Sequence, residues 1–358
     1  MRLKQRIDQK FMDMYQQLPD SMAMPDDMPC RGCGCKLGGD ALSAALRDDV
    51  ERDDAALVTL PASGGNDTTA GSMLVTTDFF SSPFRDAWLT GRVAAIHAAS
   101  DLYAMGASPF AAEAIVVLPD GDRETQRQML SDFEAGADRD FERMGARITG
   151  GHTITGPRFE VGFTVLGQST GPALIRKQGL VAGDRLFLTK PLGSGVLMAA
   201  LMRGQCRRGD YETMIDAMLH GHQTAASIAV GCDVVCGTDV TGFGLLGHLQ
   251  EMLTDDVQVQ LNAEAIPVLP GTLEAVEQGI ASTLLPSNRS YLDGVNCSNS
   301  TLQDLLLDPQ TCGGLLLAVP MARADDFCEQ FSVRGESLPA EIGVVEVATA
   351  DGSRISVR

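Results

Sequence analysis

The stretch LTGRVAAIHAASDLYAMG, residues 89–106, and the run FAAEAIVVLP, residues 110–119, decide the fold class of this chain. In the first, small and apolar side chains recur at helical spacing up to Gly106, which predicts a long helix. The second predicts a strand, so the two form one α–β unit. Asp101 lies inside the predicted helix, where a carboxylate among apolar residues is costly unless it is paired or bound to a cation. The stretch therefore predicts a packed unit with a polar site inside it.

The same alternation of helices and strands continues on both sides of this unit. Before residue 169 the pattern predicts helices at 40–48 and 123–145, strands at 72–80 and 159–168, and a strand followed by a loop at 146–156. After it, the pattern predicts helices around 195–203 and 211–230, a strand, loop and helix over 233–253, and strands near 257–261 and 315–319. We expect an α+β protein with an N-terminal helix and linker over 1–29, an N-terminal domain over 30–168 and a C-terminal α+β domain over 169–358.

Composition limits the function classes. The chain has 358 residues, 44% of them hydrophobic, and no apolar run reaches the ~20 residues of a membrane span. Residues 1–22 lack the apolar core of a secretory signal, and nine irregularly spaced cysteines fit reduced thiols, so we expect a cytoplasmic protein. The net charge of -19 argues against general nucleic-acid binding. Phosphate would therefore be bound through metal ions, local lysines and backbone amides.

Aspartates recur where apolar elements give way to loops. Asp53 and Asp54 precede a predicted strand, Asp78 follows the apolar run MLVTT, and Asp239 follows DVVCGT. Together with Asp101 they indicate a divalent-metal cluster that holds phosphates, because Mg²⁺ prefers a few carboxylates, waters and phosphate oxygens. Taken singly, each aspartate is more often a helix cap, a turn former or half of an ion pair.

Two glycine-rich stretches have the composition of anion-binding loops. TDVTGFGLLGHL, residues 238–249, places glycines where a loop enters a predicted helix, but it lacks the Gly-Lys-Ser/Thr ending of a Walker A loop. ITGGHTITG, residues 148–156, adds His152 and Thr153 as candidate donors. A histidine with its hydrogen bonds satisfied inside a loop is an equally good interpretation of His152.

The decapeptide CRGCGCKLGG, residues 30–39, has two interpretations. As a catalytic loop, it offers Cys33 as a thiolate and Lys36 as a nearby charge that lowers the thiol pKa and offsets phosphate charge. As half of a zinc site, it would contribute to a four-thiolate site assembled from Cys30, Cys33, Cys35, Cys232 and Cys236. The spacings miss the regular pairs of Cys-x-x-Cys, and the last two cysteines fit core thiols better.

Read in order, eight segments resemble the motif series of the selenophosphate synthetases (selenide, water dikinases). They are GCGCK (32–36), DDAA (53–56), TTDFF (76–80), GRVAAIHAASDLYAMGASP (91–109), GGHT (150–153), GDRLFLTKPLGSG (183–195), GTDVTGFGLLGHL (237–249) and DPQTCGGLL (308–316). The match runs from about residue 30 to about residue 320 without reordering. It lies within the superfamily that includes aminoimidazole ribonucleotide synthetase and thiamine-phosphate kinase, and the Cys-Gly-Cys-Lys loop points to the selenium enzyme.

The resemblance implies a two-domain aminoimidazole ribonucleotide synthetase-like fold, whose N-terminal domain forms the dimer and the ATP cleft under a mobile catalytic loop at 30–39. It implies formation of selenophosphate, AMP and orthophosphate from selenide, ATP and water. Carried over by position, the catalytic pair is Cys33 and Lys36, and the metal ligands are Asp54, Asp101 and Asp239. The implied ATP-binding residues are Lys36, Glu51, Arg52, Asp53, Asp78, Asp101, Gly150, Gly151, His152 and Thr153.

The expected cofactors and partners follow from the same resemblance. They are more than one Mg²⁺ ion per site, a monovalent cation such as K⁺, ATP, selenide or a selenium-delivery protein, and a second copy of the chain; neither nucleic acid nor a membrane is expected. The chain departs from the family at Cys312, where serine is common, and at Cys30, which forms Cys-x-x-Cys with Cys33. Two alternatives stay open: another ATP-dependent kinase or synthetase of the superfamily, and a cysteine-based zinc or redox protein.

Overall fold

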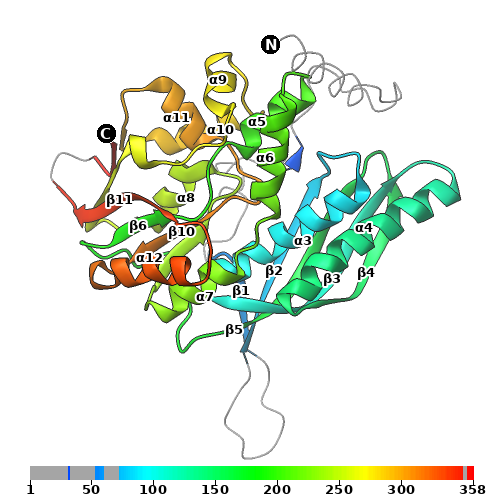
Figure 1. Cartoon of the computed structure of the whole chain (residues 1–358), viewed down its shortest axis with the longest axis horizontal. Helices are drawn as coiled ribbons and strands as arrows, with labels where there is room; N and C mark the ends of the chain where they lie inside the picture. Colours follow the sequence, from blue (N-terminus) through cyan, green and yellow to red (C-terminus); the bar gives the residue numbers. More distant parts are fainter. Residues whose placement is uncertain (1–30, 33–52, 60–71, 350–352) are drawn as a thin grey trace, which may run out of the picture.

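The computed structural model describes residues 31–32, 53–59, 72–349 and 353–358 (Figure 1). The predicted helix at 40–48 and the site residues Cys33, Lys36, Glu51 and Arg52 lie outside the described residues, as do Cys30 and Cys35. Within them, the chain forms two sheets, each with its own helices.

The first sheet has five strands in the order β1-β2-β5-β3-β4. Their bounds are β1 Ala56–Thr59, β2 Ser72–Ser81, β3 Ala107–Pro119, β4 Arg147–Gly156 and β5 Glu160–Ser169. Strand β5 pairs antiparallel with β2 and with β3, and β3 pairs parallel with β4. The parallel pair requires a crossover connection, which one of the helices supplies.

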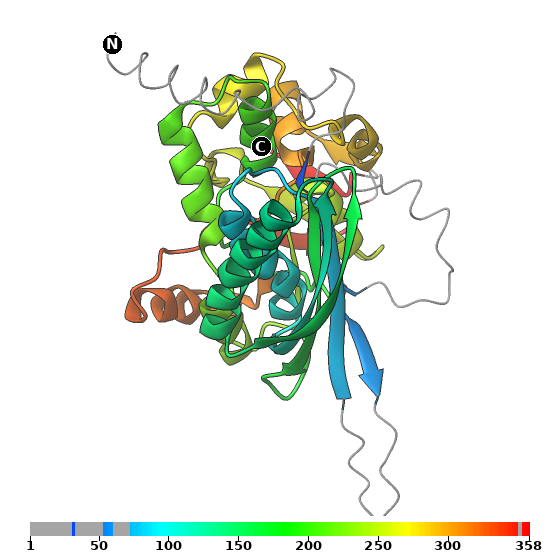
Figure 2. The same ribbon diagram turned by 90° about the vertical axis from the view of Figure 1, so that its right-hand side faces the viewer.

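Helices α3 (Ala87–Ala104) and α4 (Arg123–Met144) cover one face of this sheet, and the opposite face has no described helix on it (Figure 2). The Asp86 side chain caps α3 by accepting from the Leu89 amide, and Asp122 caps α4 in the same way. The helix backbones touch, because a Cβ added at Gly91 would lie 2.0 Å from the Phe133 carbonyl oxygen. Glycine at this crossing therefore fixes the distance between the two helices.

The second sheet has seven strands in the order β7-β10-β6-β11-β8-β12-β9. Their bounds are β6 Arg185–Leu188, β7 Cys236–Asp239, β8 Val257–Leu261, β9 Val295–Asn296, β10 Leu315–Val319, β11 Ala340–Val347 and β12 Ile355–Val357. All five residues of β10 are buried, as expected for an apolar strand in the interior of a sheet. The helices of this half are α5 Ser194–Met202, α6 Arg208–Leu219, α7 Gln223–Gly231, α8 Gly244–Met252, α9 Thr272–Glu277, α10 Leu285–Asn288, α11 Ser300–Leu307 and α12 Ala324–Val333.

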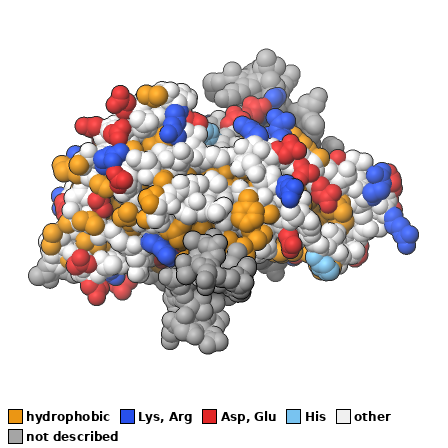
Figure 3. All heavy atoms as spheres, turned by 90° about the horizontal axis from the view of Figure 1, so that it is seen from below, with side chains coloured by type: hydrophobic (Ala, Val, Ile, Leu, Met, Phe, Trp, Pro, Cys, Tyr) orange, Lys and Arg blue, Asp and Glu red, His pale blue; other side chains and the backbone are white. Residues whose placement is uncertain are grey.

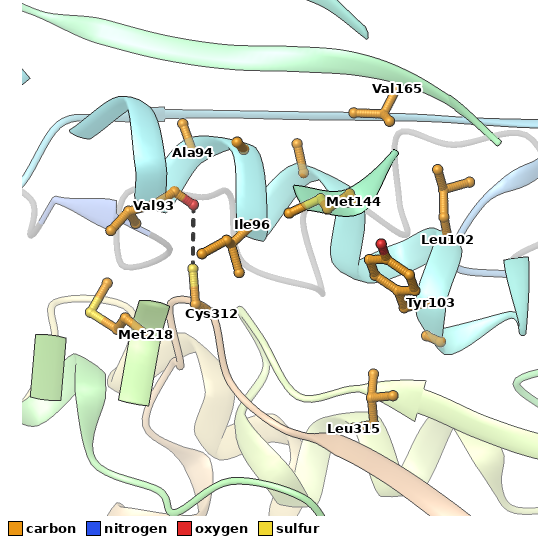
Figure 4. Packing of buried hydrophobic residues seen from close by; sticks show 14 of the residues in the cluster. Val93, Ala94, Ile96, Leu102, Tyr103, Met144, Val165, Met218, Cys312 and Leu315 are labelled. Atoms are coloured by element: carbon orange, nitrogen blue, oxygen red, sulfur yellow. Dashed lines mark hydrogen bonds between the residues drawn. The ribbon is translucent and has the colours of Figure 1, made fainter. Parts of the chain in front are cut away.

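Helix α3 lies between the two halves and is buried on nearly all sides. It contacts β2 and β5 of the first sheet and β7, α6 and α7 of the second half. Figure 4 shows Cys312, Met218 and Leu315 of the second half beside α3. Because both cores pack on this helix, its residues are held in a fixed position relative to both sheets.

The predicted strands and helices are largely confirmed, with three corrections. The helix predicted at 211–230 is two helices, α6 and α7, separated by a turn that contains Gly221. The predicted loop after the strand in 146–156 is wrong, because β4 continues to Gly156. Asp78 does not end a strand but lies within β2, where more exposed and buried side chains alternate through Phe80 and the strand ends at Ser81.

The surface carries charged side chains of both signs, in keeping with the 21% of charged residues in the sequence. Acidic and basic side chains lie interspersed around an apolar area on the face seen in Figure 3. Among the described residues, no helix combines the length and the apolar character that a membrane span needs.

Candidate functional site

Three carboxylates from distant parts of the chain meet where α3 packs against β7. Asp54 lies two residues before β1, Asp101 lies in α3, and Asp239 is the last residue of β7. One oxygen of each carboxylate lies within 4.8 Å of the other two. We call these three residues the carboxylate cluster. The residues grouped from sequence as metal ligands thus lie together in space.

Hydroxyl groups on neighbouring elements hold the carboxylate cluster. The Thr76 hydroxyl on β2 donates to Asp101 Oδ2 at 2.5 Å, and the Thr238 hydroxyl donates to Asp54 Oδ1 at 3.0 Å. The hydroxyl of Ser100, the residue before Asp101, donates to the carboxylate of Asp239. Each carboxylate therefore has a hydrogen-bond donor that orients it but brings no positive charge.

Burial and mutual repulsion disfavour the charged forms of these aspartates. Burial raises the pKa of Asp54 to about 6, with Asp239 adding to the rise and the Lys177 ammonium opposing it. Burial also raises the pKa of Asp101 well above its usual range, and the carboxylates of Asp239, Asp78 and Asp54 raise it further. Negative charge concentrated in this way is stabilised by a cation.

Lys177 is the one cationic side chain in contact with the cluster among the described residues, and the sequence analysis missed it. Its Nζ lies 2.7 Å from Asp54 Oδ1 and 3.4 Å from Glu251 Oε2. Burial opposes its charge, but the carboxylates of Asp54, Glu251 and Asp239 together raise its pKa. The only sequence signal was an isolated Arg-Lys pair in the segment ALIRKQGL that joins the two halves.

Asp53 lies beside the cluster but is already engaged. Its carboxylate lies 2.5 Å from Arg176 Nη1 and accepts from the Lys177 amide at 3.1 Å. These contacts attach the segment that carries Asp54 to the segment that carries Lys177. The described contacts of Asp53 therefore join two segments of the chain. The resemblance implies that Asp53 contacts the nucleotide.

Asp78 lies on β2 facing α3, and it is 7% exposed. Its Oδ2 lies 3.6 Å from Nε2 of the buried His97 on α3. Its charge is close enough to raise the pKa of Asp101. The structure thus brings Asp78 near the cluster, although the predicted position at a strand end was wrong.

The stretch Gly150–Thr153 lies away from the carboxylate cluster of its own chain. It is part of β4, the strand at the opposite edge of the sheet from β1, and its side chains are exposed. Strands β5 and β3 separate it from β2, which carries Thr76 and Asp78. Gly151 allows a close backbone approach within the sheet, because a Cβ there would lie 2.3 Å from the Ala114 carbonyl oxygen.

Two described residues precede Cys33 in the sequence. The Arg31 guanidinium donates to the Ser82 carbonyl at 3.3 Å. Gly32 has φ +64, and a Cβ there would lie 2.7 Å from Thr311 Oγ1. The chain therefore passes between the two halves just before it reaches Cys33.

The two cysteines of the second half that entered the zinc hypothesis are core thiols, as predicted. Cys232 and Cys236 are each 1% exposed, and neither forms a disulfide. Burial raises the pKa of the Cys236 thiol to about 12, which disfavours the thiolate that zinc requires.

The donor set of the carboxylate cluster fits magnesium. It consists of carboxylate oxygens, the ligands that Mg²⁺ prefers, and Asp54 Oδ2 is buried without a hydrogen-bond partner in the described part of the chain. A buried oxygen without a donor is costly unless a cation or water binds it. In residues 53–59, 72–349 and 353–358 no other group of three or more metal-ligating side chains is as close together.

Comparison with known families gives two matches along the chain. The family described as AIR synthase related protein, N-terminal domain, matches residues 52–170, and AIR synthase related protein, C-terminal domain, matches residues 181–355. Among solved structures, thiamine monophosphate kinase from Aquifex aeolicus has a TM-score of 0.60 at 18% identity, covering 89% of this chain and 94% of that one. Hydrogenase maturation protein HypE in complex with ATP has a TM-score of 0.59 at 16% identity, covering 88% and 85%. These neighbours show the two-domain fold.

Sequence relatives are more similar. Selenide, water dikinase of Clostridioides difficile (strain 630) is 31% identical over 333 residues, covering 88% of this chain and 92% of that protein. Selenide, water dikinase of Desulfitobacterium hafniense (strain Y51) is 36% identical over 299 residues, covering 81% and 86%. The protein of the same name from Nitratidesulfovibrio vulgaris (strain DP4) is 35% identical over 327 residues, covering 88% of each. With these relatives, both domain matches and the shared fold, the chain belongs to the selenide, water dikinase family.

Proposed function

We propose that this chain is a selenide, water dikinase, like its relatives, and catalyses the reaction that the resemblance implies: ATP, selenide and water give selenophosphate, AMP and orthophosphate. The observation that carries the proposal is the carboxylate cluster, found in a chain whose relatives are selenide, water dikinases. Phosphoryl transfer depends mainly on positioning and charge stabilisation, so a buried anionic site that can hold divalent ions is the feature that this chemistry needs.

In this proposal Asp54, Asp101 and Asp239 hold Mg²⁺, which when bound neutralises phosphate charge and orients the phosphate oxygens. The hydroxyls of Thr76, Ser100 and Thr238 keep the carboxylates oriented. Lys177 balances part of the negative charge before any ion arrives. We propose more than one Mg²⁺ ion per site and a requirement for a monovalent cation such as K⁺. Varying the concentration of each cation alone tests both.

Cys33 and Lys36 supply the selenium side of the reaction in this proposal. A cysteine thiolate is a soft group suited to handling hydroselenide, and a lysine three residues on lowers its pKa and offsets phosphate charge. Asp78 would face the nucleotide from β2, and Glu51 and Arg52 would join Asp53 beside it. The free, buried thiols of the described residues support a reducing compartment, so we propose the cytoplasm.

We also propose a homodimer that forms through the open face of the first sheet. Support comes from large apolar side chains exposed on its strands, namely Val58, Phe79, Phe110 and Ile154. Gly150–Thr153 lies on this sheet, away from the cluster of its own chain, so its predicted nucleotide contact would serve the site of a second copy. Light scattering coupled to gel filtration tests the dimer.

Phosphorus NMR of the protein with Mg-ATP and selenide under anaerobic conditions tests the proposed function. We expect a selenophosphate signal together with AMP and orthophosphate in equal amounts. Asp101→Asn is the matched negative control, since the amide keeps the shape of the side chain and removes its charge. AMP or ADP formed at the same rate without selenide would instead favour another kinase or synthetase of the superfamily.

A further inference from the structure

The loop DPQTCGG at residues 308–314 is buried although it has no regular secondary structure. Four of its side chains are at most 2% exposed, those of Asp308, Gln310, Thr311 and Cys312. The loop runs beside the two residues that follow Asp239. The Gln310 amide donates to the Thr241 carbonyl, and the Val240 amide donates to the Gly314 carbonyl, each at 2.8 Å. One side of the loop is thus fixed to the chain that leaves the carboxylate cluster.

Another part of the loop contacts the chain just before Cys33. Thr311 Oγ1 occupies the space beside Gly32, at 2.7 Å from where a Cβ would lie. The Thr311 amide donates to the Ser194 hydroxyl at the start of α5, which keeps Thr311 in place. Because φ of Gly32 is +64, a larger residue would be strained there as well as crowded.

Cys312 joins this loop to helix α3. Its Sγ donates to the Val93 carbonyl at 3.4 Å (Figure 4), and Val93 lies about two turns before Asp101 on the same helix. Its own carbonyl accepts from the buried Lys190 ammonium at 3.0 Å. Its φ of 53 lies in the left-handed region, which is costly for a residue with a side chain. A glycine would adopt this backbone more easily, so the side chain itself accounts for the presence of cysteine.

We propose that the 308–314 loop positions Gly32, the residue before Cys33, relative to the carboxylate cluster, and that Cys312 is a positioning residue through its contact with α3. The loop touches the residue before Cys33, the residues after Asp239 and the helix of Asp101. Serine, which the resemblance has at this position, offers a hydroxyl donor in the same place. The inference rests on the proposed function, because Cys33 acts only in that reaction.

Three variants of Cys312 separate positioning from stability. Cys312→Ser keeps a donor and should retain the wild-type yield of selenophosphate per ATP consumed. Cys312→Ala and Cys312→Gly lose the contact with α3, and each should lower that yield about tenfold, since misplacing a reacting group by about 1 Å can cost about a hundredfold. Glycine also relieves the backbone strain, so Cys312→Gly should melt no lower than Cys312→Ala. A purely structural role predicts instead that the yield of selenophosphate per ATP falls only in those variants whose melting temperature falls.

A second pair of variants tests the Gly32 contact. Gly32→Ala places a methyl group against Thr311, whereas Gly145→Ala strains a φ of +78 where nothing lies within 4 Å of the new Cβ. Only Gly32→Ala should lower the yield of selenophosphate per ATP. Equal yields in all variants, with an active wild-type protein, would overturn the inference alone. Absence of selenophosphate from the wild-type reaction would overturn the proposed function and the inference with it.

Discussion

Two aspartates in the N-terminal half, the buried Asp140 and the partly buried Asp101, differ in how their charge is satisfied. Asp140 on α4 accepts from Arg92 on α3 through two nitrogens, at 2.6 and 3.3 Å, and Arg143 lies 3.6 Å away. Asp101 on α3 has a hydroxyl donor and other carboxylates around it. A buried charge with a complete partner stabilises the packing of two helices, whereas a buried charge facing like charges marks a place for a cation.

The largest effect is expected when Asp101 of the carboxylate cluster loses its charge. Asp101→Asn should lower ATP turnover more than about a hundredfold, because even groups that only orient a metal ligand are worth about 10- to 100-fold. The free energy of unfolding without metal should stay the same or rise, since one repelling charge is gone. Turnover assays and chemical denaturation measure the two quantities. Near-normal turnover would remove Asp101 from the metal site.

The opposite result is expected at Asp140. Asp140→Asn leaves the Arg92 guanidinium, whose side chain is 11% exposed, without its counterion, and should cost about 3 kcal/mol of stability. ATP turnover per folded molecule should match that of the wild-type protein. If both variants lost turnover equally, the distinction between a paired and an unpaired aspartate would not hold.

Addition of Mg²⁺ sharpens the comparison. A ligand at a hundred times its dissociation constant stabilises a fold by about 2.7 kcal/mol. Mg²⁺ should therefore raise the melting temperature of the wild-type protein and of Asp140→Asn, and chelation should reverse the rise. Asp101→Asn should respond weakly. An equal response in all three proteins would show that Mg²⁺ acts at another site.

Asp308 provides a third kind of buried acid and the smallest expected effect. Burial raises its pKa to about 7, and its Oδ2 has no hydrogen-bond partner among the described residues. The folded state therefore binds a proton that the unfolded state has already released, so stability falls as pH rises between the unfolded pKa near 3.8 and about 7. Between pH 5 and 6 the free energy of unfolding should fall by about 1 kcal/mol per pH unit because of Asp308, and the Asp308→Asn variant should show a smaller fall. Denaturation at each pH measures the slope; an unchanged slope in the variant would assign it to other groups.

The sequence predicted the alternating fold and a group of five aspartates, because apolar periodicity and isolated carboxylates are local signals. The choice of Asp54, Asp101 and Asp239 among the five came from the family resemblance. The residues that complete the site depend on packing. Thr76, Ser100 and Lys177 reach the cluster only because β2, α3 and the segment between the two sheets meet there. Thr and Ser are common in every context, so their types carry little information.

The errors also have physical causes. The run TGGHT has the glycines of a loop, but its position at the edge of the sheet tolerates glycine in an extended strand. Asp78 follows an apolar run and was expected at its end, yet Phe79 and Phe80 continue the alternation of exposed and buried positions. The 308–314 loop gave no periodic signal, so its contacts with Gly32 and α3 could not be predicted.

The close contact of α3 with α4 at Gly91 links position 91 to the carboxylate cluster. Asp101 lies about 15 Å further along the same helix, at 1.5 Å per residue. A methyl group at position 91 would have to push the Phe133 carbonyl aside or tilt α3, and a tilt would move Asp101 relative to Asp54 and Asp239. The Mg²⁺ affinity of a Gly91→Ala variant would then report how far a displacement imposed at one end of α3 is transmitted along the rigid helix to Asp101.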